Sequence, residues 1–270
     1  MVRVAALQLS SQANVAENLR VVGRLIERVV AAEAELVVLP EGFAFLGPEI
    51  EKIRQAESWG EGGPIQDFLC RTAQDHHLSI IAGGMPEKSE DPSRPYNTSV
   101  AIDGDGRLVG KYRKIHLFDA DLDDGTKLNE SSASMAGGAC VVVELRDLRI
   151  GLAICYDLRF PQLFASQRAQ DAQLLTVPSA FTATTGAAHW HVLQRARAIE
   201  NQCYVVAPAQ WGTHPGGRRT FGHTLIVDPW GRMSAELQEG VGLVVADVET
   251  ETVDATRRQM PIEQHRRPFR

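Results

Sequence analysis

Hydrophobic residues along this 270-residue chain repeat with two different periods. Short apolar runs bounded by polar residues predict buried β-strands, and longer stretches with apolar positions three or four apart predict amphipathic helices. The clearest helix spans residues 14–33, where Leu19, Val22 and Ile26 fall on one face. Predicted strands and helices alternate through most of the chain, which indicates an α/β fold with much of its sheet parallel.

The apolar runs that predict strands are residues 2–9, 35–39, 78–82, 97–102, 108–112, 150–154, 173–177, 203–207, 223–227 and 243–247. Further helices are predicted over residues 64–77, 161–170 and 187–201, with a short polar helix near the C-terminus. A glycine-rich turn at residues 103–106 joins two strands into a hairpin. A polar loop, residues 119–138, separates two halves of loosely similar element order. No linker or low-complexity segment divides the chain, so we expect a single domain, residues 1–270.

Composition narrows the class of protein. The hydrophobic fraction of 44% and charged fraction of 23% are typical of a soluble globular protein. The net charge of −6 and the absence of a long basic run disfavour nucleic acid or an anionic membrane surface as a partner. No apolar run approaches the ~18 residues of a membrane span, and the N-terminus lacks the pattern of a signal peptide. The four cysteines form no Cys-x-x-Cys pair or disulfide framework, which favours the reducing cytoplasm.

Residues 149–161 join a predicted strand to a predicted helix at Cys155, and Pro161 suits the first position of that helix. A thiol at such a junction faces unpaired N–H groups and the positive end of a helix dipole, both of which favour the thiolate. Because the thiolate attacks carbonyl carbon, Cys155 is a candidate nucleophile. Taken alone, a cysteine here is more often a buried packing residue.

Glu41 and Lys114 also follow predicted strands directly, and sites in α/β sheets gather outside the carboxyl ends of strands. Glu41 would take the proton of Cys155 if burial raised its pKa. Lys114 would stabilise the oxyanion of an attacked amide beside a backbone N–H near Tyr156. The product would be a thioester, hydrolysed by water. Spacing alone leaves alternatives open, with Glu41 as a turn residue or helix cap and Lys114 as a solvated charge.

Three segments, in this order, resemble the catalytic motifs of the nitrilase superfamily of carbon–nitrogen hydrolases. They are Leu-Pro-Glu at 39–41, Tyr-Arg-Lys-Ile-His-Leu at 112–117 and Gly-Leu-Ala-Ile-Cys-Tyr-Asp-Leu-Arg-Phe-Pro at 151–161. The resemblance implies a four-layer α-β-β-α sandwich with Glu41 as base, Lys114 as oxyanion partner and Cys155 as nucleophile. It also implies a second glutamate, matched by Glu130, that orients Lys114 or helps manage the catalytic proton. A homodimer without metal or organic cofactor is expected from the same resemblance.

Further segments, residues 178–182, 189–190, 195–204 and 227–231, resemble the amidase branch that includes deaminated glutathione amidase and omega-amidase. Residues 207–210 and 264–268 favour the first of these activities. The resemblance implies a small-molecule amide substrate with a 2-oxo acid end, such as deaminated glutathione, cleaved to 2-oxoglutarate and cysteinylglycine. The alternatives are omega-amidase action on 2-oxoglutaramate or 2-oxosuccinamate, hydrolysis of nitriles or N-carbamoyl groups, and a non-catalytic binding protein on the same fold.

A 2-oxo acid carries a carboxylate, which a bidentate guanidinium binds well. Arg159, four residues after the nucleophile, is the candidate, and its alternative role is pairing with a structural carboxylate such as Asp157. Tyr156 beside the nucleophile, and Phe181 and Thr182 after a strand end, are further candidates for the substrate pocket.

The remaining motifs predict neither a metal site nor another hydrolase class. His189 and His191 are two apart on a predicted helix, so their side chains point to different faces. No cysteine–histidine cluster has zinc-like spacing. The glycines around residues 104–110 do not match a phosphate-binding loop, and the chain contains no Gly-x-Ser-x-Gly elbow.

Overall fold

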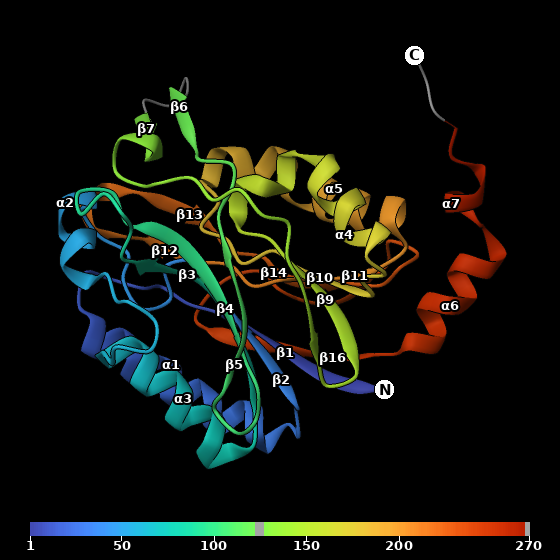
Figure 1. Cartoon of the computed structure of the whole chain (residues 1–270), viewed down its shortest axis with the longest axis horizontal. Coiled ribbons are helices and arrows are strands. Elements are labelled where there is room, and N and C mark those ends of the chain that lie inside the picture. Colours follow the sequence, from blue (N-terminus) through green and yellow to red (C-terminus); the bar gives the residue numbers. More distant parts are fainter. Residues whose placement is uncertain (122–126, 268–270) are drawn as a thin grey trace.

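Two six-stranded sheets lie face to face, and helices cover the outer face of each (Figure 1). The computed structural model describes residues 1–121 and 127–267. The strand order is β16-β1-β2-β3-β4-β5 in the first sheet and β15-β14-β11-β10-β9-β8 in the second. This arrangement confirms the expected α-β-β-α sandwich. The predicted domain boundary at residue 270 lies outside the described residues, as does Pro268 of the C-terminal segment, so the full extent of the domain stays a prediction.

The first sheet consists of β1 (Val2–Gln8), β2 (Leu36–Leu39), β3 (Ser79–Glu87), β4 (Tyr96–Ile102), β5 (Leu108–Arg113) and β16 (Gly242–Val248). Its three central strands, β1, β2 and β3, pair in parallel, and the outer strands pair antiparallel. Helices α1 (Val15–Ala31) and α3 (Pro64–His76) cover its outer face. The side chain of Asn14 caps α1 by accepting a hydrogen bond from the Glu17 amide, and the apolar stripe of this helix is buried.

The second sheet consists of β8 (Val142–Leu145), β9 (Leu148–Leu152), β10 (Leu174–Thr176), β11 (Tyr204–Ala207), β14 (Thr224–Val227) and β15 (Met233–Leu237). Helices α4 (Pro161–Ala169) and α5 (Ala183–Asn201) cover it, and α4 begins at Pro161 as predicted. Strands β9, β10 and β11 pair in parallel, so their carboxyl ends reach the same edge of the sheet.

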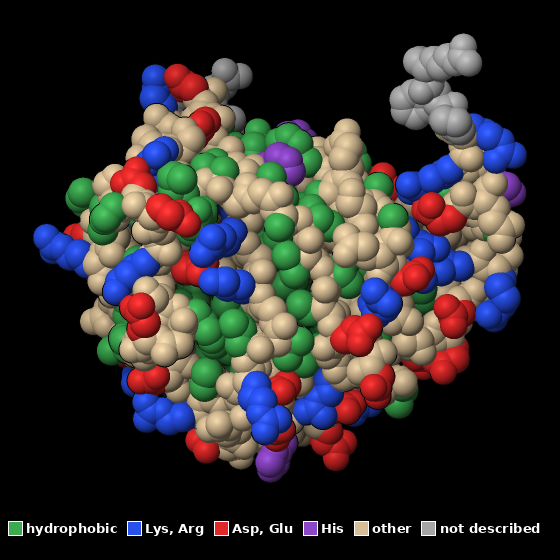
Figure 2. Space-filling model, viewed as in Figure 1, with side chains coloured by type: hydrophobic (Ala, Val, Ile, Leu, Met, Phe, Trp, Pro, Cys, Tyr) green, Lys and Arg blue, Asp and Glu red, His purple; other side chains and the backbone are tan. Residues whose placement is uncertain are grey.

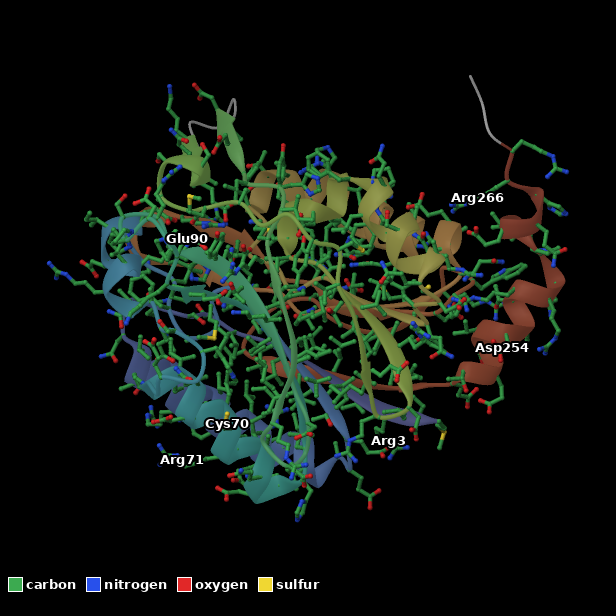
Figure 3. All side chains as sticks on the ribbon, viewed as in Figure 1. Arg3, Cys70, Arg71, Glu90, Asp254 and Arg266 are labelled. Carbon is green, nitrogen blue, oxygen red and sulfur yellow. The ribbon has the colours of Figure 1, made fainter. Side chains whose placement is uncertain are left out.

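Smaller elements lie around this edge and at the C-terminus. They are α2 (Glu49–Lys52), η1 (Ile53–Gln55), β6 (Asp119–Asp121), β7 (Lys127–Asn129), η2 (Glu130–Ser132), η3 (Cys155–Arg159), β12 (Trp211–Thr213), η4 (Pro215–Gly217), β13 (Arg219–Phe221), α6 (Thr250–Gln259) and α7 (Ile262–His265). The segment predicted as an unstructured polar loop therefore holds a short hairpin and a 3₁₀ turn in its described part. Asp254 and Arg266 mark the C-terminal helices, which stand at one side of the sandwich (Figure 3).

One core lies between the sheets, where side chains such as Val38 and Leu152 are fully buried, and a second lies between the first sheet and helices α1 and α3. Strands buried on both faces explain the continuous apolar runs in the sequence. Among the described residues, no helix combines the length and apolar character needed to cross a membrane. Figure 2 shows basic and acidic side chains interspersed over one face of the molecule. The four cysteines are free thiols, and Cys70 lies on α3 in the outer helical layer (Figure 3).

Candidate active site

Glu41, Lys114 and Cys155 meet in one cavity of about 180 Å³. Glu41 follows β2, Lys114 follows β5, and Cys155 is the first residue of η3, shortly after β9. The first two residues come from one sheet and the third from the other, so the cavity opens where the two sheets bring their strand ends together. All three side chains are buried, with the lysine only 2% exposed.

Lys114 is held between two carboxylates. Its Nζ lies 3.1 Å from Oε1 of Glu41 and 3.0 and 2.8 Å from the two carboxylate oxygens of Glu130. The backbone is fixed on both sides, because the Lys114 amide donates to the carbonyl of Asn97 and its carbonyl accepts from the amide of Gly137, each at 2.8 Å. The ammonium therefore has one position, facing the cavity. Glu130, expected from the resemblance alone, is in direct contact with it.

Glu41 is oriented by groups from three other segments. Its Oε1 accepts a hydrogen bond from Nδ2 of Asn97 at 2.8 Å, and its Oε2 accepts one from the amide of Ala180 at 3.0 Å. Gly84 packs against its side chain with φ +71°, and a Cβ there would lie 2.8 Å from Cγ of Glu41. Only glycine combines that conformation with so close an approach. The carboxylate is thus aimed rather than free to rotate.

Asn97 is a residue of the candidate site that sequence reasoning missed. Besides Glu41, its Nδ2 reaches Oε1 of Glu130 at 3.3 Å, so one amide group links the two carboxylates that contact Lys114. Asn97 lies within β4 and is itself buried. Asn97 begins the polar run Asn97-Thr98-Ser99 of this buried strand, and that run is the only signal the sequence offers.

Cys155 has a left-handed backbone, with φ +48°. Non-glycine residues adopt this conformation rarely, and such residues are common at functional sites. The surroundings hold the turn in place, since the Cys155 amide donates to the carbonyl of Pro178 at 2.9 Å. Asp157, fully buried, accepts from the Ile154 amide at 2.9 Å and from the hydroxyl of Tyr112 at 2.7 Å. The turn presents the thiol to Glu41, and the two side chains shift each other's pKa.

In the cavity one ammonium, Lys114, contacts two carboxylates, and this arrangement determines the direction in which each pKa shifts. Burial is the largest influence on Glu41 and raises its pKa, but Lys114, Arg218 and the Cys155 thiol together bring this pKa below its ordinary value. Burial likewise opposes ionisation of Glu130, yet Lys114 and Lys52 lower the pKa of Glu130 to about 2. Burial lowers the pKa of Lys114, while Glu130 and Glu41 raise it well above the ordinary value. The raised pKa proposed for Glu41 is therefore wrong, because its cation lies in contact.

The expected preference of Cys155 for the thiolate is also wrong for the free enzyme. Burial is the largest influence and raises the pKa of the thiol, and the negative charge of Glu41 raises it further. Lys114 and a backbone hydrogen bond from Ala180 act in the opposite direction but do not compensate. The segment after Cys155 is a short 3₁₀ helix, η3, rather than the start of α4. The thiol and the carboxylate thus form a neutral donor beside a charged acceptor.

Cationic side chains gather around the rest of the cavity. Lys52, Lys127 and Arg218 line it together with Lys114. Arg218 donates from Nη2 to the carbonyl of Ala180 at 2.7 Å, and its buried Nε has no partner among the described residues. Sequence analysis, which considered only long basic runs, did not single out Arg218. The lining thus holds four cationic side chains against three carboxylates, Glu49 among them, and this excess of one positive charge favours an anionic ligand.

The four predicted substrate-binding residues lie beside the cavity but are not part of its lining. The guanidinium of Arg159 lies 5.7 Å from the ring centre of Tyr156 and 5.4 Å from that of Phe181, and Nη1 lies 3.2 Å from Nδ1 of His189. Asp157, named as a possible structural partner of Arg159, instead accepts from Tyr112 and pairs with His116. Thr182 caps α5 through its side chain. The roles of Arg159, Tyr156, Phe181 and Thr182 in binding substrate stay predictions.

Comparison with known proteins assigns the family. A model described as carbon–nitrogen hydrolase matches residues 3–258. Deaminated glutathione amidase of Synechocystis sp. is 45% identical over 265 residues, 97% of each chain. The crystal structure of the Caenorhabditis elegans NitFhit protein matches with a TM-score of 0.92 and 40% identity, over 98% of this chain and 65% of that one. Saccharomyces cerevisiae Nit3, of branch 10 of the nitrilase superfamily, matches with a TM-score of 0.90 and 30% identity, over 99% and 97% of the two chains.

These matches cover almost the entire chain and agree with the three motifs read from the sequence. The fold, the order of the motifs and the relatives all point to the same superfamily. The chain therefore belongs to the carbon–nitrogen hydrolase family, and it is an enzyme that hydrolyses carbon–nitrogen bonds in linear amides.

Proposed function

We propose that the protein is a cysteine-dependent amidase that works through a thioester on Cys155. The observation that carries this proposal is the contact of Glu41, Lys114 and Glu130 around one buried cavity that also exposes the thiol. A base, an oxyanion partner and a nucleophile within hydrogen-bond reach are the components that acyl transfer requires.

In the first half-reaction, Sγ of Cys155 attacks the amide carbon while its proton passes to Glu41. The transfer accompanies the attack, because the resting thiol is protonated and the resting carboxylate is ionised. The Lys114 ammonium and the Tyr156 N–H, which lies in the first turn of η3, stabilise the oxyanion. Glu41 then returns the proton to the departing nitrogen, and the carbon–nitrogen bond breaks to leave a thioester.

In the second half-reaction, water attacks the thioester as Glu41 accepts one of its protons. The tetrahedral intermediate collapses, the carbon–sulfur bond breaks, and the proton returns to the Cys155 sulfur. Glu130 keeps Lys114 charged and in position throughout, which follows from its two contacts with Nζ. The products are a carboxylic acid and an amine.

We propose deaminated glutathione as the substrate, cleaved to 2-oxoglutarate and cysteinylglycine. The cationic lining of the cavity supports an anionic amide, with the unpaired Nε of Arg218 as the group best placed for a carboxylate. The Synechocystis relative, which carries the name of this activity, supports the same substrate. We further propose a homodimer, as the resemblance implies, and a place in the cytoplasm, which the cysteine pattern favours.

A substrate panel with matched cysteine variants tests the mechanism. We expect the purified enzyme to hydrolyse deaminated glutathione, Cys155→Ala to abolish turnover with the fold intact, and Cys140→Ala to retain full activity. Retained turnover in Cys155→Ala would contradict the thioester. A much higher kcat/KM for 2-oxoglutaramate would assign the enzyme to omega-amidase instead.

Two neighbouring arginines provide the test of substrate binding. Arg218→Met removes a cavity-lining guanidinium, and we expect KM for the anionic amide to rise about 10- to 100-fold. Arg219→Met, in which the adjacent exposed residue is changed, serves as the control and should leave KM unchanged. Arg159→Met, measured in parallel, shows whether the predicted arginine contributes. An unchanged KM in Arg218→Met would exclude this residue as the carboxylate partner.

A further inference from the structure

A second cluster of ionisable side chains lies outside the catalytic cavity. His191 extends from α5, His223 lies between β13 and β14, and Glu236 belongs to β15. Oε1 of Glu236 lies 2.7 Å from Nε2 of His191 and 2.7 Å from Nδ1 of His223. Three segments distant in the sequence thus bring two imidazole nitrogens to the same carboxylate oxygen.

The three ligand atoms all lie within 4.8 Å of one another. In a tetrahedral zinc site, bond lengths of about 2.0 to 2.2 Å place neighbouring ligand atoms about 3.3 Å apart. The two separations of 2.7 Å to Glu236 would lengthen when an ion binds, and all three ligand atoms already lie within 4.8 Å of one another. Two histidines and one glutamate form a donor set suited to a first-row divalent ion.

The rings are held in place before any ion arrives. The ring of His223 stacks on Phe221, with centres 4.2 Å apart and planes at 20°, and His191 meets the same phenyl ring edge-on. The indole of Trp190 donates to the carbonyl of His223 at 2.8 Å. His223 also keeps a left-handed backbone with φ +57°. Ring packing and this backbone hydrogen bond therefore orient both imidazoles.

Solvent reaches the cluster as well. The exposed side-chain fractions are 32% for His191, 20% for His223 and 18% for Glu236. A buried ion pair would exclude water, whereas this half-exposed position leaves an open side for a water molecule as the fourth ligand.

We propose that His191, His223 and Glu236 bind one divalent transition-metal ion, with Zn²⁺ as the best fit. The ion links α5 to the β14–β15 edge of the second sheet and thereby stabilises the fold. It takes no part in amide hydrolysis, since none of its ligands lines the catalytic cavity. Spacing along the sequence could not indicate this site, because the partner of His191 is His223 on another segment rather than His189.

Metal titration of chelator-treated Cys155→Ala protein tests the proposal without interference from the catalytic thiol. We expect calorimetry to give one Zn²⁺ per chain, and excess Zn²⁺ to raise Tm by about 5 °C. Glu236→Gln and His191→Ala should weaken binding by at least about 100-fold. His189→Ala, on the same helix, is the matched control and should bind as the parent does.

The absorption spectrum of Co²⁺ bound to the same Cys155→Ala protein identifies the ligand atoms, and it does not depend on how the His191 and Glu236 variants fold. Visible d–d bands without a thiolate charge-transfer band support a site of nitrogen and oxygen ligands. A thiolate band would place the ion on a cysteine and overturn the proposal. Absence of binding, or equal affinity in the parent and Glu236→Gln, would overturn it too and leave the cluster as a hydrogen-bonded ion pair.

Discussion

Glu41 and Glu87 are both buried glutamates at the first sheet, yet their surroundings differ in one respect. Glu87 accepts hydrogen bonds from Thr98 at 2.7 Å and from Nε of Arg113 at 2.9 Å, and it also pairs with Lys111. Two cations, Lys111 and Arg113, therefore contact one carboxylate. At Glu41 the numbers are reversed, because one cation, Lys114, contacts two carboxylates, Glu41 and Glu130.

The difference separates a structural carboxylate from a reactive one. Burial raises the pKa of Glu87, but Arg113, Lys111 and Thr98 together lower it to about 2, so this group stays ionised. Glu41 also has a lowered pKa, but the negative charge of Glu130 opposes the lowering. A carboxylate that shares its cation can accept a proton during a reaction at a smaller cost. The one-to-two ratio around Lys114 is thus what suits Glu41 to act as a base.

The largest effect is expected from exchanging each carboxylate for an amide. Glu41→Gln removes the acceptor of the Cys155 proton, and we expect kcat to fall about 10³- to 10⁴-fold, as for the loss of a general base. Glu87→Gln, which leaves the cavity lining intact, should retain kcat. Steady-state kinetics of both variants on the same amide makes the comparison, and equal losses in kcat would show that the two glutamates do not differ in role.

Replacing Lys114 or Lys111, which lie three residues apart, tests the difference between Glu41 and Glu87 through the free energy of unfolding. Lys114→Met leaves Glu41 and Glu130 buried without a cation, and we expect the free energy of unfolding to drop by about 3 to 5 kcal/mol. Lys111→Met leaves Glu87 paired with Arg113, so the loss should stay near 1 kcal/mol. Denaturant unfolding measures both. A Lys114→Met protein as stable as Lys111→Met would mean that the cavity carboxylates are solvated.

Much of the fold could be predicted from local patterns, and the exceptions have local causes. The run at residues 78–82 predicts the start of β3, but the strand continues to Glu87 across Gly83, Gly84 and Pro86. A register shift between Ala82 and Met85 accommodates these residues, which normally indicate a strand end. Strand β15 escaped prediction because it is a partly exposed edge strand without clear alternation.

Some residues of the candidate site could likewise be predicted from local patterns, and others could not. Glu41, Lys114 and Cys155 could be predicted because each follows a strand, a position that local pattern reveals. Asn97 and Arg218 could not, since their importance arises from contacts with residues far along the chain. The direction of the pKa shift of Glu41 also needed the structure, because burial and a contacting ammonium act in opposite directions.

The smallest effect concerns acid stability. Because the pKa of Glu87 in the folded protein is about 2, below its ordinary value of 4.5, its ionised form stabilises the fold above about pH 5. That contribution is lost as the pH falls through the range from 4.5 to about 2. Unfolding curves at several pH values should therefore show a flatter acid limb for Glu87→Gln than for the parent, by about 1 kcal/mol, since Lys111 and Arg113 are partly solvated. Parallel limbs would mean that Glu87 has the same pKa folded and unfolded, and its contrast with Glu41 would then rest on geometry alone.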